Sequence, residues 1–176
     1  MKILLIRHGE TTGDVEDRYG GSYDDPLTEK GCEQLQETAQ RLVGIQVDKL
    51  YSSTLLRARQ SADIINSVLK TQFELLDGLR ERDYGVLGGL TKQEALKQYP
   101  EAVELHKDPI NTDPAGESQA DFGERVLNTF KSISNQKYDV VAIVSHGGPI
   151  KVILRHLNLS LPEKIGDGEI IEIHQG

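Results

Sequence analysis

The stretch DVVAIVSHGG, residues 139–148, indicates the fold class most strongly, because an apolar run is followed by Ser145, a histidine and two glycines. The stretch KILLIRHG, residues 2–9, has a similar arrangement near the N-terminus, with Arg7 in place of the serine and one glycine. A short apolar run of this kind is typical of a strand that is buried on both faces. Two such strands, separated by further strands and helical patterns, indicate an α/β fold with a mostly parallel sheet.

The rest of the chain alternates strands and helices. Further strands are predicted over residues 49–52, 73–76 and 170–173, the last at a sheet edge. Helices are predicted from an N-cap at Thr28 to a stop at Gly44, over 58–69, over 122–133, and after Gly147 with Pro149 in the first turn. Short helices that end or restart at Pro100 and a loop over 107–116 complete the pattern. No linker divides the chain, so we expect one domain over residues 1–176.

Composition and charge exclude several classes of function. The 176 residues carry 20 basic and 28 acidic side chains, and the net charge of −8 argues against nucleic acid or an anionic membrane as a partner. Cys32 is the only cysteine, so neither an intrachain disulfide nor a cysteine-built zinc site is expected. No apolar run is long enough to span a bilayer, and the N-terminal run stops before Arg7. We expect a cytoplasmic protein without membrane or nucleic-acid partners, and a homodimer is compatible with the sequence.

A histidine follows each of these two predicted strands, His8 after residues 2–6 and His146 after residues 139–144, and each directly precedes a glycine. Ligands of open α/β sheets bind at the carboxyl ends of the strands. Arg7 adds a guanidinium that matches phosphate oxygens, and a helix beginning near Gly148 would direct free N–H groups toward an anion. A single histidine at a strand end is more often structural or solvated, but two in the same context favour function. These residues predict a phosphate-binding site.

Five segments of the chain extend this prediction. They are RHGET (7–11), YSSTLLRA (51–58), LRERDYG (79–85) continued by GGLT (88–91), GES (116–118) and SHG (145–147). In this order they resemble the motifs of the histidine phosphatase superfamily, the phosphoglycerate mutase-like proteins. The resemblance implies a three-layer α/β/α sandwich with a mostly parallel sheet. Its first and fourth strands would be adjacent at the centre and would bring the two histidines together.

The resemblance also implies a role for each of five residues. His8 would be the nucleophile and form a phosphohistidine, while Arg7, Arg57 and His146 would hold the oxygens of the transferred phosphoryl group. Glu81 would protonate the leaving alcohol and then help to deprotonate the attacking water. Phosphoryl transfer demands positioning and charge neutralisation, which two arginines and a histidine can supply. No metal site and no cofactor are therefore expected.

A second group of residues is predicted to bind the substrate. These residues are Gly9, Thr11, Asp14, Arg18, Gly20, Gly21, Tyr23, Tyr84 and Gly147. Asp14 departs from the family pattern, because many members have an asparagine there that contacts the phosphate. A carboxylate at this position would repel phosphate unless it is turned away, protonated or paired with Arg18. Gly20 and Gly21 stand where mutases usually have a threonine-glycine pair.

The segment between Glu81 and Gly116 favours a phosphatase over a mutase. Mutases carry an insertion here with a pair of arginines, whereas this chain has no arginine between Arg82 and Arg125. A shorter cap would admit water to the intermediate. We therefore expect a phosphomonoester hydrolase acting on a small phosphorylated metabolite such as ribazole phosphate or a sugar phosphate. The alternatives are a phosphoglycerate mutase, a protein phosphohistidine phosphatase and a non-catalytic protein that binds a phosphorylated ligand.

Overall fold

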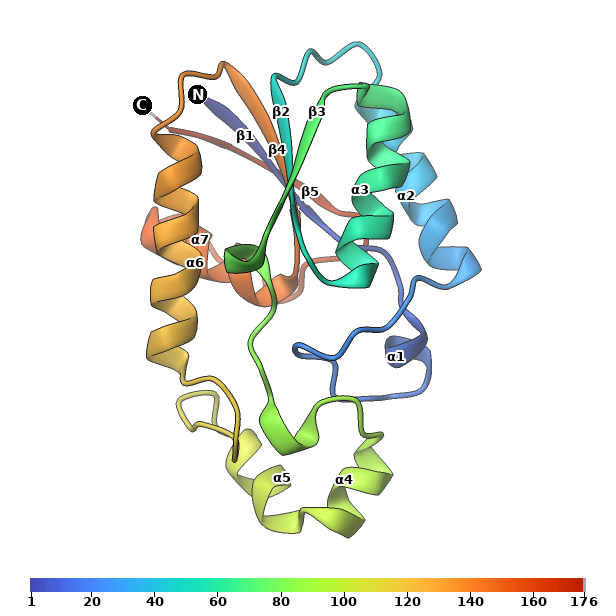
Figure 1. Ribbon diagram of the computed structural model, residues 1–176, viewed down its shortest axis with the longest axis vertical. Coiled ribbons are helices and arrows are strands. Elements are labelled where there is room, and N and C mark those ends of the chain that lie inside the picture. The colour runs from blue at the N-terminus through green and yellow to red at the C-terminus, as the bar shows by residue number, and fades with distance from the viewer. Residues whose placement is uncertain (176) are drawn as a thin grey trace.

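Five strands form one sheet in the computed structural model, which describes residues 1–175 (Figure 1). They are β1 (Lys2–Arg7), β2 (Lys49–Ser53), β3 (Gln72–Leu76), β4 (Val140–Ser145) and β5 (Ile170–His174), in the spatial order β3-β2-β4-β1-β5. β4 pairs in parallel with β1 and β2, and β2 with β3, whereas the edge strand β5 is antiparallel to β1. The predicted mostly parallel sheet with adjacent first and fourth strands is confirmed.

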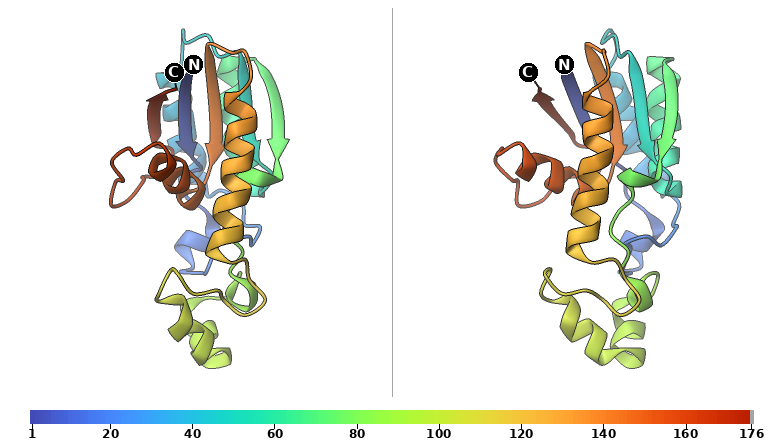
Figure 2. Two further views of the ribbon diagram at one scale, coloured as in Figure 1. Left: turned by 90° about the vertical axis from the view of Figure 1, so that its left-hand side faces the viewer. Right: turned by 60° about the vertical axis from the view of Figure 1, so that its left-hand side comes forward.

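Helices cover both faces of the sheet and complete a three-layer α/β/α sandwich (Figure 1, Figure 2). One face carries α2 (Glu29–Arg41) and α3 (Leu56–Leu69), and the other carries α6 (Gln119–Ser134) and α7 (Gly147–His156). Leu4 and Ile6 of β1 belong to the core under α2 and α3, whereas Ile3 and Leu5 belong to the core under α6 and α7. Successive side chains of a strand point to opposite faces, so one uninterrupted apolar run fills two cores. None of the helices within residues 1–175 has the length and apolar composition needed to cross a membrane.

Local signals set where the helices begin and end. Thr28 is the N-cap of α2, as predicted, and its hydroxyl accepts a backbone N–H from the first turn. α2 ends before Gly44, which adopts a φ of 83° in the following turn, a conformation that favours glycine. α7 begins directly after His146 and has Pro149 in its first turn, as predicted.

A small helical cap lies beyond the carboxyl ends of the parallel strands (Figure 2). Its elements are α1 (Thr12–Val15), the 3₁₀ turn η2 (Gly85–Leu87), α4 (Lys92–Gln98) and α5 (Pro100–His106), whereas the 3₁₀ turn η1 (Asp77–Leu79) follows β3 and packs against α6. α5 begins at Pro100, so the predicted helix break is confirmed. Asp113, in the loop after α5, is buried and pairs with Arg82 at 3.5 Å and with His106 at 3.0 Å. These contacts join the cap to the chain segment that carries Glu81.

Leu4→Ala should lower the free energy of unfolding by about 3 kcal/mol, because the substitution leaves a cavity in a packed core. Leu4 is only 1% exposed, whereas Leu75 on β3 is 39% exposed. Leu75→Ala should therefore cost less than about 1 kcal/mol. Urea unfolding of both variants measures the difference, and equal losses would contradict the position of Leu4 in the core.

Candidate active site

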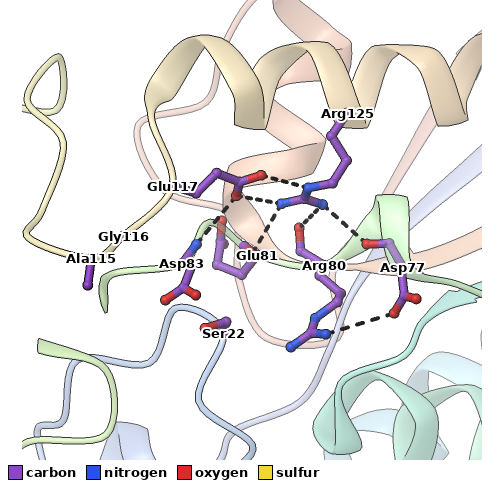
Figure 3. A pocket seen from close by; sticks show the side chains of 9 residues that line it. All are labelled: Ser22, Asp77, Arg80, Glu81, Asp83, Ala115, Gly116, Glu117 and Arg125. Atoms are coloured by element: carbon purple, nitrogen blue, oxygen red, sulfur yellow. Dashed lines mark hydrogen bonds and ion pairs between the residues drawn. The ribbon is translucent and has the colours of Figure 1, made fainter. Parts of the chain in front are cut away.

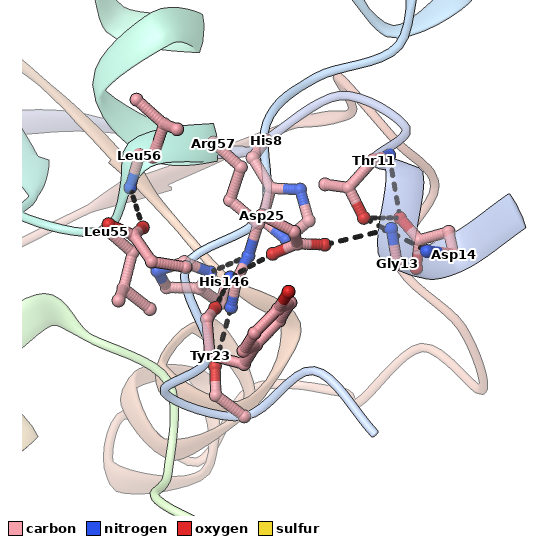
Figure 4. Close-up of polar contacts among 12 residues, drawn as sticks. His8, Thr11, Gly13, Asp14, Tyr23, Asp25, Leu55, Leu56, Arg57 and His146 are labelled. Carbon is pink, nitrogen blue, oxygen red and sulfur yellow. Dashed lines mark hydrogen bonds and ion pairs between the residues drawn. The ribbon is translucent and has the colours of Figure 1, made fainter. Parts of the chain in front are cut away.

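The pairing of β1 with β4 brings His8 and His146 together. Arg7 lies opposite Ser145 in the register of the two strands, so each histidine follows its strand at the same level of the sheet. The ring centroids are 5.0 Å apart, and both side chains are buried (Figure 4). The predicted adjacency of the two histidines is therefore present in the structure.

Hydrogen bonding assigns the tautomer of His8. Its Nδ1 lies 2.8 Å from the main-chain oxygen of Gly9. A carbonyl oxygen only accepts, so Nδ1 carries the proton and Nε2 keeps its lone pair. Burial lowers the pKa of His8 well below its ordinary value, and the positive charges of Arg57 and Arg7 lower it further. His8 is thus a neutral imidazole with Nε2 available as a nucleophile.

His146 is held by two partners, one on each ring nitrogen. Its Nδ1 accepts a hydrogen bond of 3.2 Å from Nε of Arg57, so the proton is on Nε2, which lies 2.8 Å from Oγ of Ser53. Burial is the main cause that lowers the pKa of His146 well below its ordinary value, followed by the charge of Arg57. Ser53 belongs to a segment that the motif analysis included, but the sequence pattern did not single it out.

Arg57 is buried at the start of α3 and joins three parts of the site (Figure 4). Besides its bond to His146, its Nη1 donates to the main-chain oxygen of Tyr23 and to Oδ1 of Asp25, both at 2.7 Å. Its Nη2 donates to the main-chain oxygen of Gly21 at 2.7 Å. Four of its five N–H groups therefore have partners in the protein, and the guanidinium fixes the loop after α1 against the sheet.

Asp25 is a site residue that sequence reasoning missed. Its side chain and that of Arg57 are each 4% exposed and form an ion pair. The second carboxylate oxygen accepts the N–H of Gly13 at 3.2 Å. The neighbouring Asp24 accepts the first N–H of α3, from Leu56. Two consecutive acidic residues before a proline look like an ordinary polar loop, so no local signal distinguishes the buried one.

Arg7 is fixed by the loop that leads into β5. Its Nη1 donates to the main-chain oxygen of Ile165 at 2.6 Å and pairs with Asp167 at 2.8 Å. This loop lies far from the N-terminal motif in the sequence and was not predicted to reach the site. Arg7 lines both cavities that His8 lines.

The first turn of α7 holds the carboxyl group of Glu81 beside the site. Its Oε2 accepts the N–H of Gly148 at 2.9 Å, and its Oε1 accepts the N–H of Arg82 at 3.0 Å. A Cβ atom at Gly148 would overlap the carboxyl group. The absence of a side chain at Gly148 is therefore what allows the carboxyl group to approach the helix N-terminus.

Two cavities share Arg7, His8, Glu81 and Tyr84. The smaller, of about 160 Å³, is also lined by these predicted substrate-binding residues: Thr11, Asp14, Arg18, Gly20 and Gly21. The larger, of about 510 Å³, is also lined by Gly147, Gly148, Lys151 and Lys164.

Two predicted binding residues lie outside the lining of both cavities. Gly9 packs against α2, where a Cβ would meet the main-chain oxygen of Gly31. Tyr23 contributes its main-chain oxygen to Arg57, while its side chain is 43% exposed. Both residues therefore support the site from its edge.

The carboxylate of Asp14 is engaged by the backbone of its own turn. Its Oδ2 accepts the N–H of Thr11 at 2.9 Å and the Thr11 hydroxyl at 2.8 Å, which forms a capping box at α1. Arg18 pairs instead with Glu16 and donates to the main-chain oxygen of Gly89 at 2.6 Å. The sequence left three arrangements open for the Asp14 carboxylate, and the one in which it pairs with Arg18 is therefore wrong.

Within residues 1–175, no group of three or more His, Cys, Asp or Glu side chains is arranged to hold a metal ion.

The low pKa values of His8 and His146 predict acid-sensitive folding. Below about pH 6.5 the unfolded chain binds protons that the folded protein excludes, so the free energy of unfolding should fall as the pH decreases. Each histidine should contribute up to about 1.4 kcal/mol per pH unit.

Unfolding curves between neutral and acidic pH measure this effect in the wild type and in His8→Asn. His8→Asn should lose part of the pH dependence, while His156→Asn, at an exposed residue of α7, should keep it. An identical pH dependence in His8→Asn and the wild type would contradict a buried neutral His8.

The chain is similar to named proteins along most of its length. It is 31% identical over 163 residues to "Uncharacterized phosphatase PhoE" of Bacillus subtilis (strain 168), and this match covers 92% of this chain and 79% of that protein. It is 34% identical over 156 residues to "Phosphoglycerate mutase-like protein 4" of Arabidopsis thaliana, which covers 85% of this chain and 68% of that protein. The structure of the alpha-ribazole phosphatase from Shigella flexneri superposes with a TM-score of 0.88 at 25% identity, over 100% of this chain and 91% of that chain.

The sequence profile of the histidine phosphatase superfamily (branch 1) matches residues 3–170. This range contains all five motif segments and both histidines. The resemblance inferred from those segments is confirmed, and the chain belongs to the histidine phosphatase superfamily.

Proposed function

We propose that the protein is a phosphomonoesterase that hydrolyses a small phosphorylated metabolite through a phosphohistidine at His8, without a metal or cofactor. Membership in the superfamily and the likeness to PhoE support a phosphatase. The observation that carries the proposal is the neutral His8, whose Nε2 lone pair is available where the two cavities meet. Arg7 and Arg57 line the smaller cavity and supply positive charge for phosphoryl oxygens.

In the first step, Nε2 of His8 attacks phosphorus while the bond from phosphorus to the ester oxygen breaks. The electron pair of that bond goes to the leaving oxygen, and Glu81 in its protonated form gives that oxygen a proton. The products are an alcohol and phosphohistidine. Arg7 and Arg57 offset the negative charge of the phosphoryl oxygens, and Asp25 is already neutralised by Arg57.

In the second step, a water molecule attacks the phosphohistidine. Glu81, now ionised, accepts a proton from this water, and the bond between phosphorus and Nε2 breaks. Inorganic phosphate leaves and His8 returns to its neutral form. The hydrogen bond from Nδ1 to Gly9 keeps the same tautomer throughout, so Nε2 is ready for the next substrate.

The size of the larger cavity supports a small substrate. Its volume of about 510 Å³ is within the usual range for small-molecule sites. Tyr84 and Pro109 line this cavity together with residues of α7. The structural likeness to an alpha-ribazole phosphatase supports a phosphorylated nucleoside-like or sugar-like metabolite.

His8→Ala should reduce phosphate release from an aryl phosphate by at least about a thousandfold, because the nucleophile is removed. The assay contains a chelator, and His156→Ala, at an exposed histidine, serves as the matched control. Rapid acid-free quenching of the wild type should trap the added mass of one phosphoryl group, which His8→Ala should lack.

Full activity in His8→Ala, or loss of wild-type activity with the chelator, would contradict the proposal. An inactive wild type that binds inorganic phosphate would favour the non-catalytic alternative. Faster isomerisation of phosphoglycerate than phosphate release would favour the mutase.

Gly148→Ala should lower the rate of phosphate release by about a hundredfold, because the added methyl group displaces the Glu81 carboxyl group. Gly123→Ala is the matched control, since it also adds a methyl group to a helical glycine but meets open space. Steady-state kinetics of the two variants give the comparison. Equal rates in both would show that the position of Glu81 is not required.

A further inference from the structure

Three cavities meet at Glu81, and one of them suits the phosphoryl group. The cavity of about 160 Å³ combines His8 with both arginines of the site. If Glu81 protonates the leaving oxygen, the alcohol part of the ester lies in one of the other two cavities. The charges that line these two cavities differ, and this difference selects the class of alcohol.

The cavity of about 390 Å³ is acidic (Figure 3). Its charged lining residues are four carboxylates and two arginines: Asp77, Glu81, Asp83, Glu117, Arg80 and Arg125. Arg125 is already bound, because its Nε and Nη2 donate to Glu117 at 2.8 Å and 2.7 Å and its Nη1 donates to three main-chain oxygens. An anionic group would meet mainly negative charge here.

The cavity of about 510 Å³ has the opposite character. It is lined by Lys151 and Lys164 in addition to Arg7 and His8. Nζ of Lys151 donates to the main-chain oxygen of Glu163 at 2.9 Å, which holds the ammonium group beside the cavity. Neither lysine forms an ion pair with another residue in the described part of the chain, so both charges are available to a ligand.

The balance of charge in this cavity depends on the protonation of Glu81. Arg7, Lys151 and Lys164 face the carboxylates of Glu81 and Glu163, and Asp167 pairs with Arg7 from outside the cavity lining. When Glu81 carries the proton that it donates in the first step, only Glu163 is negative among the lining residues. The cavity is therefore most attractive to an anion in the state that begins the reaction.

The lysines of the cap do not contribute to this charge. Nζ of Lys92 lies 3.1 Å from the centre of the Tyr19 ring, and Lys107 pairs with Glu104. Neither lysine lines a cavity that contains His8. Positive charge beside the leaving group thus comes from α7 and the loop before β5.

We infer that the larger cavity binds an alcohol part that carries a second anionic group, a carboxylate or a phosphate, through Lys151 and Lys164. This inference rests on the proposed function and names its substrate class, a phosphate monoester with a second anion. The two lysines determine specificity and take no part in bond breaking. The loop that supplies Lys164 also fixes Arg7 through Ile165, so the second anion is bound next to the phosphoryl group.

Three esters with the same four-carbon chain test the inference: hydroxybutyl phosphate, phosphooxybutanoate and butanediol bisphosphate. The measured quantity is the ratio of kcat/KM for each anionic ester to that for hydroxybutyl phosphate. We expect a ratio of about ten for at least one anionic ester in the wild type. The variant with both Lys151→Met and Lys164→Met should bring the ratio close to one. The ester with the larger ratio shows whether the second anion is a carboxylate or a phosphate.

Three further variants distinguish the loss of positive charge in the cavity from a loss of folding. Lys97→Met removes an exposed lysine of α4 and should keep the wild-type ratio. Lys151→Arg retains the charge and should keep most of the ratio. The single substitution Lys164→Met changes an exposed side chain that lines the larger cavity. The structure shows no hydrogen bond from this side chain to another residue within 1–175. This variant should therefore fold, and it tests the inference even if the double variant unfolds.

A wild-type ratio near one for both anionic esters, or a ratio that the lysine variants leave unchanged, would overturn the inference. Calorimetric affinities of phosphooxybutanoate and hydroxybutyl phosphate provide a second readout that needs no turnover. If no ester releases phosphate, the proposed function fails. The ratio of the affinities still decides whether the lysines bind a second anion.

Discussion

The parallel pairing of β1 with β4 is the constraint on which the rest of the site depends. This pairing sets His8 beside His146 and places the start of α7 next to both. Because side chains alternate along a strand, a slip of one residue would exchange the two cores and turn the strand ends away from each other. The N–H of Gly148 in the first turn of α7 helps to hold the carboxyl group of Glu81 at the site. The geometry of the candidate nucleophile and of the candidate acid therefore follows from one strand register.

Arg57 gives this arrangement its electrostatic character. A buried guanidinium is costly unless its N–H groups and its charge are matched, and here Asp25, His146 and two main-chain oxygens match them. The same charge helps to keep both histidines neutral. Asp25 pairs with one side of Arg57, and both residues line the smaller cavity beside His8. Asp14 is tolerated beside the same cavity because its carboxylate is bound by the backbone and hydroxyl of Thr11.

The two sides of Glu81 differ in a way that motif analysis could not reveal. On one side, Arg125 is bound by Glu117 and by main-chain oxygens, so it acts as an internal support for the segment that carries Glu81. On the other side, Lys151 and Lys164 face a cavity beside His8. The absence of arginine between Arg82 and Arg125 removes one place where a second anion could be held. Lys151 and Lys164, in the C-terminal part of the chain, supply positive charge at the larger cavity instead.

The sequence alone predicted the strands and most helices, and it placed a candidate phosphate site at the ends of two strands. Apolar runs predicted all five strands, Thr28 and Pro100 marked helix starts, and the segments around His8 and His146 indicated a phosphate site. These features are readable because they depend on neighbours in the chain, through alternation, capping and backbone conformation. Only the tertiary structure showed that Asp25 is buried against Arg57, that Asp167 and Ile165 hold Arg7, and that Lys151 and Lys164 line the larger cavity. Each of these contacts joins segments that are distant in sequence, and whether a charged side chain is buried, paired or facing a cavity is decided by what packs against it.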